Sequence, residues 1–306
     1  MLATNKIMFL ESSLYTGVMV VAAVLTGLLA GSITYAIAWR MTHGRRVLEV
    51  SRCPLCGHPL TLREQIPLVS WVRQHGICAY CGEQVSMAYP ASELLGAGIF
   101  SSVVLRHGVS IVTVEVLALV CVLMVAAMTS LMDYRIPNGC IFLSVLIRAG
   151  YLLALSMQGG DATSLAVTSV VGAIALGIPL LCAVWLSNAM LAREVIGMGT
   201  VKLVAVVGLY LGWQQGLICL VGAFFLGFMV WIVSPAKLLP VEVEGGPRDA
   251  SSPAEPPLSP RDLRATREED IAEPMRLIPF APSIIIACWV MLLLGVTPAL
   301  WNTPVI

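Results

Sequence analysis

Four of the nine cysteines form two closely spaced pairs, Cys53 with Cys56 and Cys78 with Cys81. A two-residue spacing lets both thiolates of a pair face one ion, and a glycine follows each pair, where it allows a tight turn. Four thiolates with this spacing favour a tetrahedral zinc site, with a redox-active dithiol or unligated thiols as the alternatives. A closed four-cysteine site has no open coordination position. We therefore expect a structural zinc that folds the surrounding loop.

The rest of the chain points to a membrane. Its 306 residues are 58% hydrophobic and only 12% charged, whereas about 25% of the residues of a soluble domain are charged. The apolar residues gather in runs, most of which have the roughly 17–25 residues that a bilayer requires. We expect an all-α polytopic membrane protein with about eight transmembrane helices and a small zinc-ribbon-like insert. The expected spans are 14–38, 92–105, 111–132, 139–157, 164–188, 201–213, 215–234 and 280–299.

Lysine and arginine are unevenly distributed between the segments that join these spans. With the N-terminus outside, nearly all of them fall in segments 39–90, 133–138, 189–200 and 236–278. Because cytoplasmic loops carry the excess of these residues, we expect both termini to be periplasmic and the cysteine pairs cytoplasmic. Disulfides are disfavoured in the reducing cytoplasm, which favours metal ligation. The composition carries no nucleic-acid signature, so the lipid bilayer is the expected environment and no nucleic acid is expected as a partner.

The same distribution divides the chain into five parts. Residues 1–38 are a periplasmic N-terminus and first span, and 39–90 are the cytoplasmic metal-binding insert. A membrane core follows over 91–235. Residues 236–278 form a Pro-rich, charged cytoplasmic loop, whose composition is typical of disorder, and 279–306 are the last span and a periplasmic C-terminus.

Several motifs follow one another in the order found in the type IV prepilin peptidases, a family of inner-membrane leader peptidases. The residues that carry the resemblance are Cys53-x-x-Cys56-Gly-His, Ile66-Pro-Leu-Val-Ser-Trp71, Cys78-x-x-Cys81, Tyr89-Pro-Ala-Ser-Glu93-Leu94, Asp133-Tyr-Arg-Ile-Pro137-Asn138, Gly197-Met-Gly199-Thr200-Val-Lys202-Leu203 and Leu277-Ile-Pro279-Phe280. They cover most of the chain, and their combination is specific.

The resemblance implies a bifunctional enzyme of the bacterial inner membrane with its active face toward the cytoplasm. Family members cleave the leader of type IV prepilins or type II secretion pseudopilins and then methylate the new N-terminus with S-adenosylmethionine. Proteolysis in the family uses two membrane-embedded aspartates. Two close carboxylates cannot both ionise cheaply, so one holds a proton while the other activates water.

This sequence departs from the family at both aspartates. Thr200 occupies the position of the second aspartate, in a motif that Gly197, Gly199 and Lys202 otherwise preserve. The first aspartate of the family falls about seven residues before the proline, where this chain has Ser130. Asp133 lies one helical turn later, so it is the tentative catalytic acid if the helix end is shortened, or a solvated helix-terminal residue if it is not.

Other charged residues leave alternatives open. Glu194 could substitute for the missing acid only if the glycines before Thr200 fold it back. Glu93 matches a family glutamate with a structural role or a role in methyl transfer. Arg148 falls inside a span, where we expect an interhelical ion pair or hydrogen bond, with a functional role as the alternative. The sequence thus predicts either a working prepilin peptidase or an inactivated member that keeps methyl transfer, prepilin binding or a role in assembly.

Overall fold

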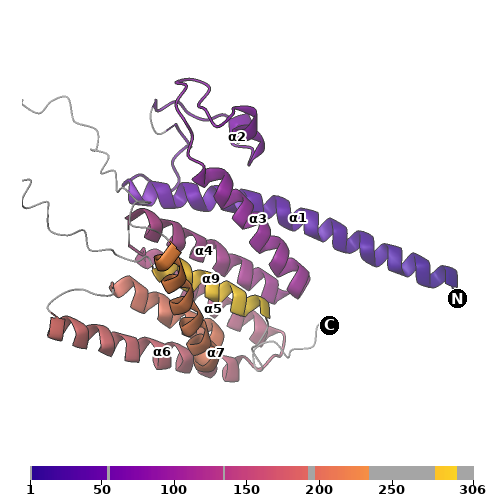
Figure 1. Ribbon diagram of the computed structural model, residues 1–306. Helices are drawn as coiled ribbons and strands as arrows, with labels where there is room; N and C mark the ends of the chain where they lie inside the picture. Colours follow the sequence, from indigo (N-terminus) through magenta and orange to yellow (C-terminus); the bar gives the residue numbers. More distant parts are fainter. Residues whose placement is uncertain (1, 54–55, 134, 192–196, 234–279, 295–306) are drawn as a thin grey trace, which may run out of the picture. The chain divides into compact units, whose positions relative to one another are not determined.

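A computed structural model describes all residues except 1, 54–55, 134, 192–196, 234–279 and 295–306 (Figure 1). Within this part the chain is helical, and β-structure is limited to two isolated bridges in the cysteine insert. The helices are α1 (Leu2–Thr42), α2 (Val69–Arg73), α3 (Ala88–His107), α4 (Ile111–Asp133), α5 (Asn138–Met157), α6 (Ala162–Leu191), α7 (Met198–Val233) and α9 (Phe280–Leu294), with a 3-10 turn at Leu62–Glu64. The all-α prediction is confirmed.

Six of the described helices, α1 and α3 to α7, are long and apolar enough to cross a membrane, and α9 is a shorter apolar helix. The predicted span 92–105 gains a turn at its start, because α3 begins at Ala88. Described residues up to Leu226 and from Phe280 form one compact unit, and Gly227–Val233 belong to a second. The predicted loop 236–278 and Glu194 lie outside the described residues.

Helix α7 is broken at Gly212, which has a φ of 72° and a ψ of 178°. A Cβ placed on Gly216 would lie 3.7 Å from the Cα of Gly208, although eight residues of a straight helix span about 12 Å. The chain therefore folds back at Gly212, a residue type that tolerates positive φ. The break falls at the end of the predicted short span 201–213, beside the predicted span 215–234, and these two spans become the two arms of α7.

Glycine also sets the distance between α1 and α3. A Cβ on Gly31 of α1 would lie 2.7 Å from the Cα of Glu93 on α3, and one on Gly27 would lie 2.8 Å from the Cα of Ala97. A side chain at either position would force the two helices apart. Helices in membranes often pack through small residues that let their backbones approach closely. The hydrophobic effect does not drive helices together there, because lipid tails are as apolar as the side chains, so close van der Waals contact is needed.

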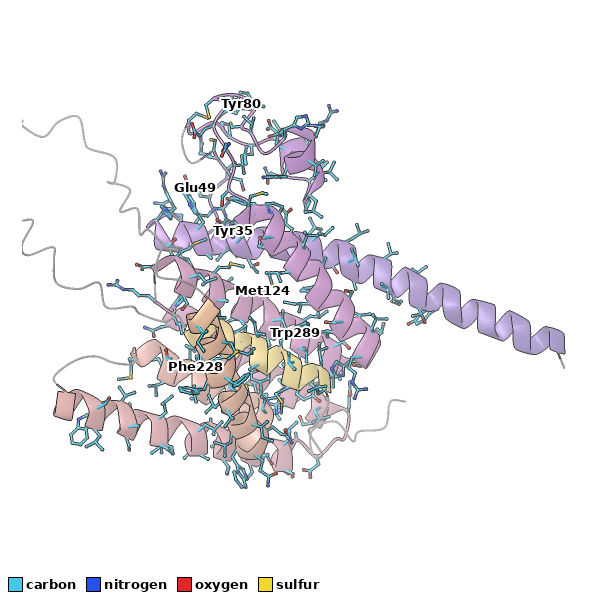
Figure 2. The ribbon with its side chains drawn as sticks, in the orientation of Figure 1. Tyr35, Glu49, Tyr80, Met124, Phe228 and Trp289 are labelled. Atoms are coloured by element: carbon cyan, nitrogen blue, oxygen red, sulfur yellow. The ribbon has the colours of Figure 1, made fainter. Side chains whose placement is uncertain are left out.

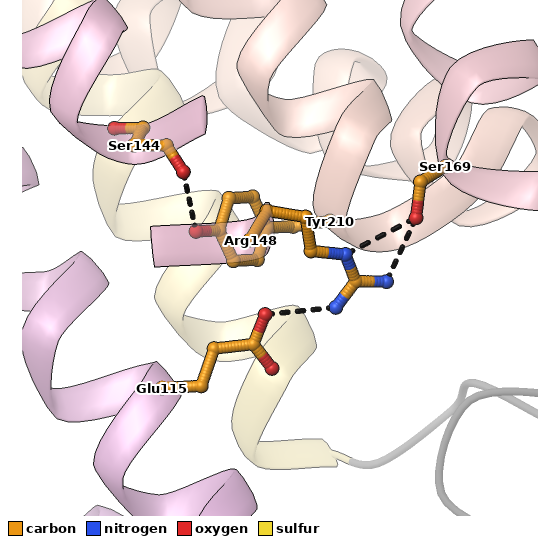
Figure 3. Close-up of polar contacts among 5 residues, drawn as sticks. All are labelled: Glu115, Ser144, Arg148, Ser169 and Tyr210. Atoms are coloured by element: carbon orange, nitrogen blue, oxygen red, sulfur yellow. Dashed lines mark hydrogen bonds and ion pairs between the residues drawn. The ribbon is translucent and has the colours of Figure 1, made fainter. Parts of the chain in front are cut away.

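The ion pair expected at Arg148 is present. Arg148 of α5 is buried and its Nη1 lies 2.9 Å from Oε1 of Glu115 on α4 (Figure 3). Its Nε and Nη2 donate to the hydroxyl of Ser169 on α6 at 3.1 and 2.9 Å. The guanidinium also lies over the ring of Tyr210 on α7, 5.3 Å from the centroid. One side chain thereby links four helices.

Candidate functional site

The cysteine insert consists of two similar turns. In the first, the N–H of Cys53 donates to the carbonyl of His58 and the N–H of Gly57 returns to the carbonyl of Cys53, at 2.9 and 3.0 Å. In the second, Cys78 and Gly82 repeat this pattern with Glu83, at 2.8 and 3.0 Å. Gly57 and Gly82 have φ values of 68° and 73°, so both glycines occupy the left-handed region that the tight turns require.

These turns bring the four cysteines together, as their spacing predicts. The ligand atoms of Cys53, Cys56, Cys78 and Cys81 all lie within 4.8 Å of one another. The Sγ atoms of Cys53 and Cys81 are 3.9 Å apart, close to the ~3.8 Å that separates sulfurs in a zinc tetrahedron with bonds of about 2.3 Å. The cluster can hold a metal ion, and its all-sulfur donor set suits zinc.

The protonation of these thiols is uneven. The backbone N–H groups of Cys81 and Tyr80 stabilise the thiolate of Cys78 and lower the pKa of that thiol to about 7. At Cys81 the N–H of Glu83 acts in the same direction, but desolvation and the neighbouring sulfurs outweigh it and raise the pKa to about 12. Four neighbouring thiolates repel one another, and a cation bound between them would remove that repulsion.

A cavity of about 690 Å³ lies between the insert, α1 and the start of α3. In Figure 2 this region can be found from three labels: Tyr35 on α1, Glu49 in the connection after α1, which lines the cavity, and Tyr80 in the insert. The cavity is lined by Leu29, Trp39 and Arg40 of α1, by Trp71 of the insert and by Tyr89 and Glu93 of α3. Sequence reasoning did not find this cavity, because its walls come from segments whose contact no local pattern encodes.

The two candidate residues for the first catalytic position, Ser130 and Asp133, have unlike surroundings. Helix α4 continues to Asp133, so its end is not shortened, and the Asp133 side chain is 53% exposed. Its Oδ2 lies 4.0 Å from Nε of Arg135, which is itself exposed. Ser130, one turn earlier, is buried. Asp133 thus lies at a solvated helix end, which was one of the two arrangements that the sequence left open.

The second predicted position lies beside the loop that follows Asp133. Gly199 packs against Ile136, since a Cβ there would lie 3.1 Å from Cβ of that residue. Nζ of Lys202 donates to Oδ1 of Asn138 at 2.8 Å. Thr200 is partly buried in the first turn of α7, and its N–H donates to the carbonyl of Gly197 at 3.0 Å.

The structure therefore brings the two motifs, 133–138 and 197–202, into contact. The insert lies at the same end of the helices, because the hydroxyl of Thr42 at the end of α1 is 3.7 Å from the sulfur of Met132 on α4. Among the described residues of segments 133–138 and 197–202, Asp133 supplies the one carboxylate and Thr200 the one side-chain hydroxyl. A hydroxyl can donate or accept a hydrogen bond, but it cannot serve as a carboxylate base near neutral pH.

Comparison with known proteins defines the class: the family described as the bacterial peptidase A24 N-terminal domain matches residues 25–107. The prepilin leader peptidase/N-methyltransferase of Bacillus subtilis is 30% identical over 205 residues, which are 67% of this chain and 77% of that protein. The same enzyme of Aeromonas hydrophila is 30% identical over 255 residues, 82% of this chain and 73% of that protein. The chain belongs to the prepilin leader peptidase/N-methyltransferase family.

A further relative is the type 4 prepilin-like proteins leader peptide-processing enzyme of Escherichia coli. It is 30% identical over 218 residues, which are 65% of this chain and 79% of that protein. No solved structure matches the chain. The resemblance read from the motifs is confirmed at the level of the family.

Proposed function

We propose that this chain processes type IV prepilins, or the pseudopilins of type II secretion, at the cytoplasmic face of the bacterial inner membrane. It removes the leader as an aspartic-type endopeptidase and methylates the new N-terminus. The observation that carries the proposal is the contact of segments 133–138 and 197–202, seen at Gly199 with Ile136 and at Lys202 with Asn138. In the family that the sequence resembles, the catalytic aspartates fall at the position of Ser130, one helical turn before the first segment, and at the position of Thr200 in the second.

Because α4 continues to Asp133 in the structure, this reaction requires the last turn of α4 to open, so that Asp133 becomes the carboxylate that activates water for attack on the scissile carbonyl. General base catalysis by one positioned group contributes about 10²–10⁴-fold. Thr200 holds the place of the second carboxylate and contributes a hydroxyl that can hydrogen-bond to the substrate. The buried Ser130 is one turn from Asp133 and supports the end of α4. Gly197, Gly199 and Lys202 position the first turn of α7 against the 133–138 loop.

The insert and the rest of the chain have separate tasks. Cys53, Cys56, Cys78 and Cys81 hold a structural zinc that folds segment 39–90. S-adenosylmethionine supplies the methyl group when it is bound. Residues 1–38 are the first span with a periplasmic N-terminus, and 91–235 are the membrane core that receives the substrate. Segment 236–278 is a cytoplasmic loop, and 279–306 are the last span with a periplasmic C-terminus.

The threonine at position 200 favours a second candidate function. Without a second carboxylate, the chain would bind prepilins and methylate a processed N-terminus, or serve pilus assembly, without cleaving the leader. This candidate differs from the first only in hydrolysis. The exposure of Asp133, whose nearest charged partner is Arg135 at 4.0 Å, also fits it.

One experiment separates the two candidates. The protein purified in detergent is incubated with a cognate prepilin or with a pre-cleaved pilin, with and without S-adenosylmethionine, and the products are weighed by mass spectrometry. We expect leader removal by the wild type and its loss in Asp133→Ala. Methylation of the pre-cleaved pilin without leader removal would establish the second candidate. A protein that does neither with any prepilin would contradict both.

A further inference from the structure

The carboxylate of Glu93 is buried and has no cationic partner among the described residues. The residue is 6% exposed, and its Oε2 accepts one hydrogen bond, from the N–H of Leu68 at 2.7 Å. Among the described residues, no arginine, lysine or histidine lies within the 4.0 Å of an ion pair to it. A buried charge is costly unless it is paired. Glu93 therefore has room for a positive partner.

A positive partner has space beside Glu93, because this residue lines the 690 Å³ cavity beneath the insert. The volume falls within the roughly 300–1,000 Å³ that is usual for small-molecule sites. Three aromatic side chains line the same space, Trp39 of α1, Trp71 of the insert and Tyr89 of α3. Aromatic faces attract cations through the ring quadrupole, and onium groups are the ligands that carboxylates and aromatic rings bind together.

The arginines of the cavity do not compensate Glu93. Arg40 donates to the carbonyl of Val47 at 2.7 Å and to the hydroxyl of Ser51 at 3.0 Å. Arg45 lies 3.9 Å from Glu49, and Arg52 donates to the carbonyl of Gly57 at 3.2 Å. The contacts of Arg40 hold the start of the insert on the end of α1, and the other two lie within the insert. Two other carboxylates line the cavity: Glu49 lies near Arg45, and Glu64 accepts hydrogen bonds from the N–H and hydroxyl of Thr61, which leaves Glu93 as the buried carboxylate of the lining.

The backbone around Glu93 is also held in an unfavourable form. Leu68, which donates the hydrogen bond to Glu93, has a φ of 58° and a ψ of −49°. Non-glycine residues in such regions cost about 1–3 kcal/mol and persist where the surroundings impose them, often at functional sites. The hydrogen bond to Leu68 fixes one oxygen of Glu93 and with it the orientation of the carboxylate on the cavity wall.

We propose that the cavity beneath the insert binds an organic cation, with Glu93 as its counter-charge and Trp39, Trp71 and Tyr89 around it. The identity of the cation rests on the proposed function, which brings two onium groups to this face. One is the sulfonium of S-adenosylmethionine, and the other is the α-ammonium of a processed pilin. The apolar wall of α1 at Leu29 and Ile33, which are 51% and 57% exposed, suits the uncharged part of either ligand.

The test compares pairs of probes that differ by one positive charge, by equilibrium binding to the full chain in detergent. The probes are S-adenosylmethionine against S-adenosylhomocysteine, and a synthetic processed-pilin N-terminal peptide against its N-acetylated form. Glu93→Gln is the central variant, because the amide oxygen keeps an acceptor for the N–H of Leu68. Glu49→Gln is the control, since Glu49 lines the same cavity but already lies near Arg45.

We expect Glu93→Gln to weaken binding of a cationic probe at least about tenfold, or 1.4 kcal/mol, and to weaken binding of its counterpart without that charge less than about threefold. Loss with S-adenosylmethionine identifies the sulfonium as the ligand, and loss with the free-amine peptide identifies the ammonium. Equal weakening of both members of each pair, or no weakening of either cationic probe, would overturn the proposal.

Two further measurements keep the outcome readable. Zinc content and melting temperature show whether Glu93→Gln is folded. If it is not, Ala36→Phe fills the cavity from α1 and should abolish binding of the cationic probe. Retained binding in that variant would also overturn the proposal. Prepilin processing without Glu93-dependent binding would refute this inference alone, whereas Glu93-dependent binding in a chain that processes no prepilin would refute the proposed function alone.

Discussion

Two glutamates are buried to nearly the same extent, Glu115 at 5% and Glu93 at 6% exposure, yet their surroundings are opposite. Glu115 meets Arg148 at 2.9 Å, and the arginine is shared with Ser169 and two tyrosine rings. Glu93 meets one backbone N–H and a cavity. The carboxylate of Glu115 is paired with a buried arginine, so this arrangement stabilises the helix bundle. The second is open and can receive a ligand.

The difference follows from what each glutamate joins. Glu115 and its partners lie on four helices of the bundle. A charge there must be paired, because an unpaired charge inside a membrane protein is costly, and the pairing fixes how the helices pack. Glu93 lies at the start of α3, where the helices meet the cysteine insert. Its surroundings depend on the connection between α1 and α3, which contains the two cysteine turns that can hold a metal ion.

The largest expected effect is on the insert. Cys53→Ser should lose bound zinc and unfold segment 44–87, because a loop of this size has little core of its own and metal binding supplies its folding free energy. The cavity beside Glu93 should disappear with it. Metal analysis and limited proteolysis provide the readout, and Cys182→Ser, an exposed cysteine of α6, is the control. A wild type that is metal-free and yet protease-resistant in the insert would contradict this account.

The next effect is on the buried ion pair of Arg148 and Glu115. Arg148→Met should leave Glu115 buried without a partner and destabilise the protein by about 3–5 kcal/mol. Arg148→Met combined with Glu115→Gln should recover most of that loss, because the remaining side chains are neutral. Thermal unfolding in detergent measures both. Arg135→Met, at an exposed arginine, should change little, and a double variant as unstable as the single one would show that the charge pair is not the cause.

The smallest effect concerns an exposed acid, Asp161, which directly precedes α6. The N–H of Ser164 and then the hydroxyl of Thr163 donate to its carboxylate and lower its pKa. Its stabilising contribution is therefore present above the ordinary pKa near 4 and is lost as the pH falls through the lower value of the folded state. Asp161→Ala should lower the melting temperature by at most about 2 °C at pH 7, and the difference should vanish in acid. Asp161→Asn keeps the acceptor and should resemble the wild type at pH 7.

Features encoded by short-range spacing were predictable from the sequence. The cysteine cluster, the glycine turns and the break near Gly212 each depend on residues close together in the chain. The charge of Arg148 required a partner, which the sequence could anticipate. It could not choose Glu115, 33 residues away on another helix, because helix packing decides which side chains meet.

The cavity at Glu93 could not be predicted for the same reason. Its walls combine α1, the insert and α3, and its key contact joins Leu68 to a residue 25 positions later. The position of Asp133 was also undecided, since the sequence permits α4 to end before or at this residue. The structure continues the helix to Asp133, and this places the carboxylate at a solvated end.

The most direct test concerns Thr200, because the account attributes a prepilin-processing scaffold to this chain and limits its hydrolysis at that residue. The rate of leader removal from a cognate prepilin is measured for the wild type, Thr200→Asp and Thr200→Asp with Asp133→Ala. We predict that Thr200→Asp cleaves at least about 10²-fold faster than the wild type, the contribution of one added acid–base group. We also predict that the further change at Asp133 abolishes the gain. A Thr200→Asp protein that is folded, binds the prepilin and cleaves no faster than the wild type would contradict the account.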